Sequence, residues 1–90
     1  EAYSDPLKDQ VHVFFWGSPS FGSAPLGVKF IDESIGVPTS WYWQFGDGGK
    51  SFEQNPYHEY QIPGVYTVSL RAYNEKTGGY GVWSDGIIVI

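Results

Sequence analysis

Residues 41–48, Trp-Tyr-Trp-Gln-Phe-Gly-Asp-Gly, join a strongly alternating strand to a turn sequence. Trp41, Trp43 and Phe45 fall on one side of an extended chain, because side chains alternate along a strand. The Gly-Asp-Gly-Gly that follows the strand is typical of a hairpin, since glycine readily adopts positive φ and aspartate bonds its own backbone. Trp43 is therefore the expected centre of a core between two sheets.

The same signals recur on both sides of this segment. Short apolar alternations bounded by Gly, Pro, Ser and Asn indicate strands, and no long stretch free of Gly and Pro has apolar residues at helical spacing. The expected strands are residues 11–16, 26–31, 41–45, 50–53, 57–60, 65–73 and 80–90, with 17–25 as a loop and an interruption of the last strand at 84–86. About seven antiparallel strands in two sheets make an all-β sandwich.

Two further stretches follow residues 41–48 in a distinctive order. They are Asn-Pro-Tyr-His-Glu-Tyr at 55–60 and Pro-Gly-Val-Tyr-Thr-Val-Ser-Leu at 63–70. Together with Ala-Pro-Leu-Gly-Val-Lys-Phe at 24–30, they closely resemble the PKD domain over roughly residues 10–90, which leaves residues 1–9 as an N-terminal linker. Gln44 departs from the pattern, because the family often has Asp there.

The resemblance implies an immunoglobulin-like β-sandwich without catalytic activity or a cofactor of its own. Such domains act as extracellular spacers and adhesion or interaction modules, and this sequence is most similar to copies in archaeal and bacterial cell-surface and surface-layer proteins. The residues that match the family motif are Trp41, Trp43, Phe45, Gly46, Asp47, Gly48, Asn55, Pro56, His58, Tyr60, Gly64 and Tyr66.

The partners that this resemblance implies are neighbouring domains of the parent chain, other surface proteins, or polysaccharide. As an isolated module the domain is expected to be monomeric. The alternative function is a substrate-binding accessory domain of a secreted hydrolase, such as a protease or a chitinase.

Single residues of the motif have expected structural roles. Tyr60 or Tyr66 is the candidate for a corner tyrosine, whose hydroxyl bonds back to a loop backbone. His58 alternates with Tyr60, so both side chains are expected to point inward. We interpret His58 as a buried, neutral, hydrogen-bonded core residue rather than a catalytic one.

Composition excludes several classes of function. The 90 residues suit one domain, and a net charge of −5 with scattered Lys and Arg is poorly suited to nucleic acid or anionic membranes. The absence of Cys excludes disulfides and thiolate zinc sites. No apolar run is long enough to insert into a membrane. Because the first residue is Glu1 rather than Met, the chain is interpreted as a module of a longer protein.

The sequence motifs give little support for a catalytic or a nucleotide-binding function. Gly-Lys-Ser at 49–51 lacks the earlier glycine of a P-loop and no helix follows it. His12 and His58 are the only histidines, and no Gly-x-Ser-x-Gly elbow accompanies them. A transition-metal site would need clustered His, Asp or Glu ligands, which the sequence lacks. Calcium suits the sequence better, with Asp32 and Glu33 as weak candidates for oxygen ligands, together with Asp5 and Asp9.

Aromatic residues are too numerous for the core of so small a domain, at 19% of the chain. Tyr42, Tyr73, Tyr80 and Trp83 are the candidate surface-binding residues. An exposed aromatic stripe suits a sugar ring or a partner protein, although neighbouring modules could equally cover it.

Overall fold

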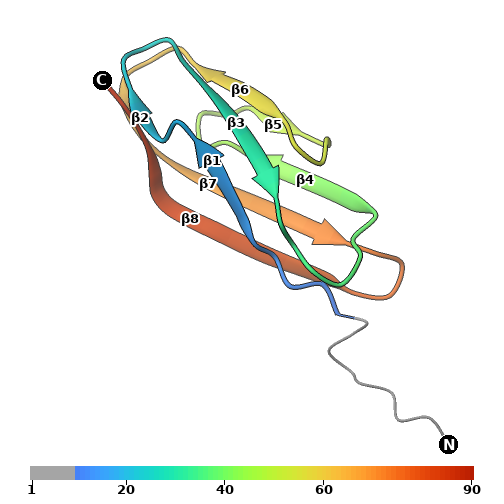
Figure 1. Ribbon diagram of the computed structural model, residues 1–90. Helices are drawn as coiled ribbons and strands as arrows, with labels where there is room; N and C mark the ends of the chain where they lie inside the picture. The colour runs from blue at the N-terminus through green and yellow to red at the C-terminus, as the bar shows by residue number, and fades with distance from the viewer. Residues whose placement is uncertain (1–9) are drawn as a thin grey trace, which may run out of the picture.

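The computed structural model describes residues 10–90, so the linker expected over residues 1–9 lies outside the described residues. The described chain consists of strands and loops arranged in two sheets (Figure 1). Its strands are β1 (Phe15–Ser18), β2 (Phe21–Gly22), β3 (Leu26–Asp32), β4 (Ser40–Gln44), β5 (Lys50–Ser51), β6 (Tyr57–Tyr60), β7 (Gly64–Tyr73) and β8 (Gly78–Val89).

The two sheets differ in size. The smaller sheet has the order β1-β3-β6, and the larger sheet has the order β2-β8-β7-β4-β5. Neighbouring strands are antiparallel except β2, which pairs parallel to β8. The predicted immunoglobulin-like sandwich is thus confirmed, with β2 as an additional short strand.

The prediction of a strand at residues 11–16 was wrong in its bounds. β1 begins only at Phe15, and His12 forms an isolated bridge to Ile35 instead. The alternation in this segment does report which side chains face inward, because Val11 is buried and Val13 and Phe15 pack against the core. The backbone partners of this segment, however, come from the loop after β3 rather than from a regular strand.

The expected loop at residues 17–25 contains the crossover between the sheets. β1 pairs with β3 in the smaller sheet, whereas β2 pairs with β8 in the larger one. Gly17 lies against the Phe30 ring, which would be 2.7 Å from a Cβ at that position. Gly17 therefore lets β1 approach the core closely just before the chain changes sheets.

The C-terminal strand is continuous rather than interrupted. A bulge occupies residues 84–86, because Tyr66 pairs with Ile87 while Val68 pairs with Trp83. Asp85 has a φ of 52° and its N–H donates to Thr67 Oγ1 at 3.1 Å. The Ser-Asp-Gly sequence thus produces a local bulge that β8 accommodates.

Trp43 lies at the centre of the core, as predicted. Its side chain is fully buried. The centre of its ring lies 5.1 Å from the centre of the Phe15 ring, in an edge-to-face contact, and 5.4 Å from the centre of the Phe30 ring. The indole Nε1 donates to the Glu53 carbonyl at 2.9 Å, so the polar atom of the ring is satisfied.

Within residues 10–90, no helix is long and apolar enough to cross a membrane.

Candidate functional site

The turn between β4 and β5 has the geometry that its glycines predict. Gly46 and Gly48 have φ values of 91° and 96°. A Cβ at Gly46 would lie 2.5 Å from the Thr67 carbonyl oxygen, so only glycine fits there. Asp47 Oδ1 accepts the Gly49 N–H at 2.9 Å, which closes the turn.

Asp47 and His58 connect this turn to the other sheet. The Nε2 atom of His58, on β6, lies 2.7 Å from Asp47 Oδ2, and the imidazole stacks on Phe45 with ring centres 4.1 Å apart. Burial alone would raise the pKa of Asp47, but the hydrogen bond with His58 and that from the Gly49 N–H lower this pKa below its usual value. His58 is partly rather than fully buried, and its role is to bridge the sheets.

Both candidate corner tyrosines bond to backbone. The buried Tyr60 hydroxyl donates to the Phe45 carbonyl at 2.8 Å, and burial raises the pKa of Tyr60 far above its usual value. The Tyr66 hydroxyl donates to the Ile62 carbonyl, a few residues upstream, which is the corner-tyrosine pattern. Gly64 lies against the side chain of Tyr66. A Cβ at Gly64 would lie 3.2 Å from the nearest ring carbon and from the hydroxyl oxygen of Tyr66.

The Asn-Pro pair of the motif secures the end of β3. Asn55 Oδ1 accepts the Asp32 N–H at 2.8 Å. Pro56 is fully buried, and its carbonyl accepts the Phe30 N–H at 2.9 Å. These contacts give both motif residues structural roles.

The carboxylate of Asp32, a predicted calcium ligand, already accepts several hydrogen bonds. Asp32 Oδ2 accepts Trp41 Nε1 at 2.9 Å and Gln54 Nε2 at 3.2 Å, and its Oδ1 accepts the Ser34 N–H at 3.0 Å. Glu33 is exposed beside it. Among residues 10–90, no group of three or more His, Asp or Glu is placed to hold a metal. The other two aspartates named for calcium lie outside the described residues.

The outer face of the larger sheet carries a cross-strand row of aromatic and basic side chains. Tyr42 on β4 pairs with Arg71 on β7, and Arg71 pairs with Tyr80 on β8. The Arg71 guanidinium carbon lies 5.5 Å from the centre of the Tyr80 ring, within the range of a cation–π contact. The Tyr42 and Phe52 rings are 5.2 Å apart. Register across adjacent strands thus builds one continuous surface.

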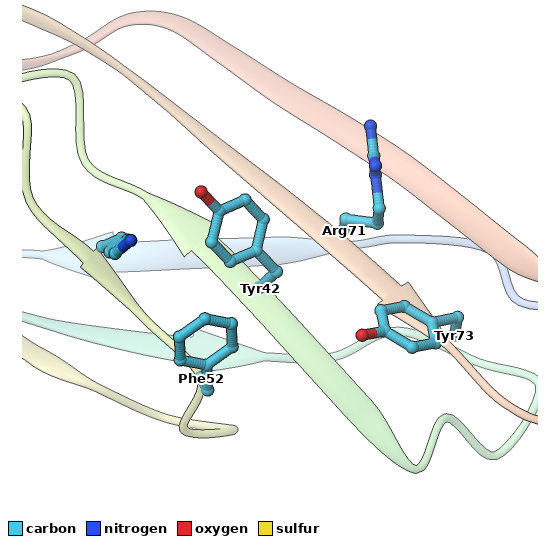
Figure 2. Close-up of a pocket in the computed structure, with 5 residues that line it drawn as sticks. Tyr42, Phe52, Arg71 and Tyr73 are labelled. Carbon is cyan, nitrogen blue, oxygen red and sulfur yellow. The ribbon is translucent and has the colours of Figure 1, made fainter.

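A groove of about 580 Å³ runs along this surface, lined by Tyr42, Lys50, Phe52, Arg71 and Tyr73. Figure 2 shows the rings of Tyr42, Phe52 and Tyr73 on the same side of the sheet, beside the Arg71 side chain. The groove shares Arg71 and Tyr73 with an adjoining depression of about 320 Å³ that reaches Tyr80. It also shares Tyr42 and Lys50 with a depression of about 510 Å³ at the β4–β5 turn.

We call this surface the aromatic groove and define it by Tyr42, Lys50, Phe52, Arg71, Tyr73 and Tyr80. It brings together three of the four predicted surface-binding aromatics. Trp83 is not among them, because it is partly buried against the core on the inner face of β8, with its ring 6.3 Å from Phe15.

Three residues of the groove were not predicted as binding residues. Phe52, which is 67% exposed, follows β5 directly, and Lys50 pairs with Gln44 across the β4–β5 hairpin. The strand pattern could have placed Arg71 on the outer face, but only the pairing between strands brings it next to the aromatic rings.

Comparison with known proteins supports the β-sandwich fold described above. The sequence profile described as PKD domain matches residues 22–86. The collagenase ColQ1 of Bacillus cereus (strain Q1) is 36% identical over an alignment of 62 residues, and the match covers 64% of this chain and 6% of that protein. The chain therefore spans only a small part of this curated relative.

Two solved structures have the same fold. The PKD1 domain of Vibrio anguillarum Epp superposes with a TM-score of 0.74 and 26% identity, over 90% of this chain and 96% of the other. The PKD1 domain of the Vibrio cholerae metalloprotease PrtV superposes with a TM-score of 0.68 and 28% identity, over 86% and 93%. With the family profile covering most of its length, the chain belongs to the PKD domain family.

Proposed function

We propose that this PKD domain is a non-catalytic module of a larger secreted or cell-surface protein, in which it spaces neighbouring domains and contacts a partner through the aromatic groove. The observation that carries the proposal is the Tyr42–Arg71–Tyr80 row, which places aromatic and basic groups side by side on an open sheet face. Phe52, Tyr73 and Tyr80 are 67%, 40% and 59% exposed. Exposed aromatic surface of this kind is typical of contact sites.

The architecture supports a spacing role. The described chain enters at one end of the sandwich and reaches Ile90 near the opposite end, so domains on either side can be held apart (Figure 1). The motif residues Trp43, His58, Tyr60 and Tyr66 are engaged in core packing or bridging contacts. The sandwich interior is thus filled by structural side chains, which fits a module without chemistry of its own.

A second candidate function is a substrate-binding accessory domain of a secreted protease. The relatives named above include a collagenase and a metalloprotease. In that case the aromatic groove would hold the protein substrate of a neighbouring catalytic domain. The two functions share the same surface and differ in the partner.

A binding assay with immobilised polymers tests both candidates. The isolated chain is applied to collagen, chitin and bacterial cell-wall glycan, and binding is measured for the wild type and for Tyr42→Ala. Tyr57→Ala is the matched control, because Tyr57 is 63% exposed but lies on the smaller sheet. We expect binding that Tyr42→Ala abolishes and Tyr57→Ala preserves. Equal loss of binding in both variants would refute the groove as the contact site for these polymers.

A further inference from the structure

The two basic residues of the aromatic groove are unusual in so acidic a chain. The net charge is −5, yet no Asp or Glu is among the described residues that line the groove or its two adjoining depressions. Lys50 and Arg71 are the charged residues there. Asp47 turns toward His58 and the Gly49 N–H instead, and Glu53, which follows Phe52 in the sequence, is not among the residues that line the groove. The groove is therefore a locally positive strip on a negative domain.

Neither cation is neutralised by the described chain. Within residues 10–90, the Arg71 guanidinium and the Lys50 ammonium form no ion pair with a carboxylate. Arg71 is instead held over the Tyr80 ring. A guanidinium placed on an aromatic ring keeps its N–H groups free for a planar anion such as a carboxylate.

The shape of the groove suits a thin polymer. Glycines line part of each adjoining depression, Gly48 and Gly49 at the β4–β5 turn and Gly78 and Gly79 in the β7–β8 hairpin. Because a glycine has no side chain beyond a hydrogen, these positions leave room for a long chain to continue past the groove. A polymer that crossed the sheet from β5 to β8 would pass over β4 and β7. Neighbouring strands are about 4.8 Å apart, so this crossing spans about 14 Å.

Polar groups lie beside the aromatic rings. Gln44 and Ser69 line the depression next to Tyr42, and Gln44 Nε2 donates to the Tyr42 hydroxyl at 3.3 Å. Rings that stack, amides and hydroxyls that exchange hydrogen bonds, and unpaired cations are together the groups that recognise a carboxylated sugar.

We propose that the aromatic groove binds an acidic polysaccharide, with Tyr42 and Phe52 against the sugar rings and Arg71 and Lys50 on the carboxylates. This inference rests on the proposed function, because it names the ligand of the same groove. An acidic peptide would satisfy the cations but would not need stacking platforms at successive positions, so we favour the glycan.

Titration calorimetry with matched polymers tests the inference. Polygalacturonate is compared with its fully methyl-esterified form, which has the same sugar chain without the charges, and with poly-glutamate, which has the charges without the sugar. We expect polygalacturonate to bind, with affinity that falls as NaCl screens the charges. Both comparison polymers should bind at least about tenfold more weakly, as expected on losing one charge-assisted or stacking contact.

Variants assign the binding to the groove. Arg71→Gln should weaken polygalacturonate binding about tenfold, whereas Lys29→Gln makes the same charge change on the smaller sheet and should leave binding unchanged. Tyr42→Ala should weaken binding without altering its salt dependence. Circular dichroism and Tm establish that each variant is folded.

Three results would overturn the inference. Equal binding of the esterified polymer means that charge is not recognised, and equal binding of poly-glutamate means that the sugar is not recognised. Absence of polygalacturonate binding also refutes it. In each case the collagen, chitin and cell-wall assay still reports whether the groove is a contact site, so failure of the ligand class is distinguishable from failure of the proposed function.

Discussion

The carboxylate of Asp47 and the imidazole of His58, 2.7 Å apart, join the larger sheet to the smaller one. Asp47 belongs to the turn after β4, and His58 to β6. Because an ionised carboxylate only accepts hydrogen bonds, Nε2 of His58 donates. Two polar residues of the family motif therefore form a clamp between the sheets.

This clamp predicts acid sensitivity. The pKa of Asp47 is lower in the folded chain than its usual value of about 3.9. The clamp therefore stabilises the fold fully above about pH 4 and is lost as the pH falls through the lower folded-state pKa. Asp47→Asn should reduce the free energy of unfolding by about 1–2 kcal/mol at pH 7, and this difference from wild type should shrink below about pH 4. Urea unfolding at a series of pH values measures it, and a difference that stays constant down to pH 2 would contradict the assignment.

The two glycines of the β4–β5 turn form a matched pair. Both have positive φ, but a Cβ at Gly46 meets the Thr67 carbonyl oxygen at 2.5 Å, whereas a Cβ at Gly48 has no atom within 4 Å. Gly48→Ala should cost about 1 kcal/mol from backbone strain alone. Gly46→Ala should cost clearly more, because the backbone must move. The Tm values of the two variants measure this difference. Equal destabilisation by the two substitutions would show that the close approach of Gly46 to Thr67 is unimportant.

Removal of the Tyr60 hydroxyl leaves the Phe45 carbonyl without its partner inside the core. Tyr60→Phe should therefore lower the free energy of unfolding by about 1–3 kcal/mol. In a spectrophotometric titration of the wild type, Tyr60 should stay un-ionised until the chain unfolds, because burial raises its pKa. A variant as stable as wild type would mean that this hydrogen bond contributes nothing.

Calcium should not stabilise the described domain. The Asp32 carboxylate is occupied by the Trp41 and Gln54 side chains and by the Ser34 N–H. Millimolar calcium should leave the Tm unchanged, and EDTA should do the same. A rise in Tm with calcium that EDTA reverses, and that Asp32→Asn abolishes, would restore the metal hypothesis.

Local signals in the sequence were enough to predict most of the fold. β3, β4, β6 and β7 lie where alternation and turn residues placed them, because each is bounded by a turn of clear chemistry. The N-terminal segment was misplaced because the alternation of Val11 and Val13 reports burial, not which backbone pairs with which. The position of β2 depends on its pairing with the last residues of β8, Ile88 and Val89, which lie more than sixty residues later in the sequence.

The candidate site was predicted only in part for the same reason. Tyr42, Tyr73 and Tyr80 could be named individually as surface aromatics. Their assembly with Arg71 depends on the register between β4, β7 and β8, which no single segment contains. Trp83 could have been separated from Tyr80 by counting, since residues an odd number apart on a strand face opposite sides.

Mapping the bound surface by NMR tests the central claim most directly. The backbone amide chemical shifts of the isotope-labelled chain are followed while a soluble polymer is added. The polymer is polygalacturonate, or a soluble form of whichever polymer bound in the immobilised assay. We predict that the shifted amides cluster at Tyr42, Lys50, Arg71 and Tyr80 on the larger sheet, while those of β3 and β6 stay unchanged. Shifts concentrated on β3 and β6, with the groove amides unmoved, would contradict the claim that the aromatic groove is where this domain meets its partner.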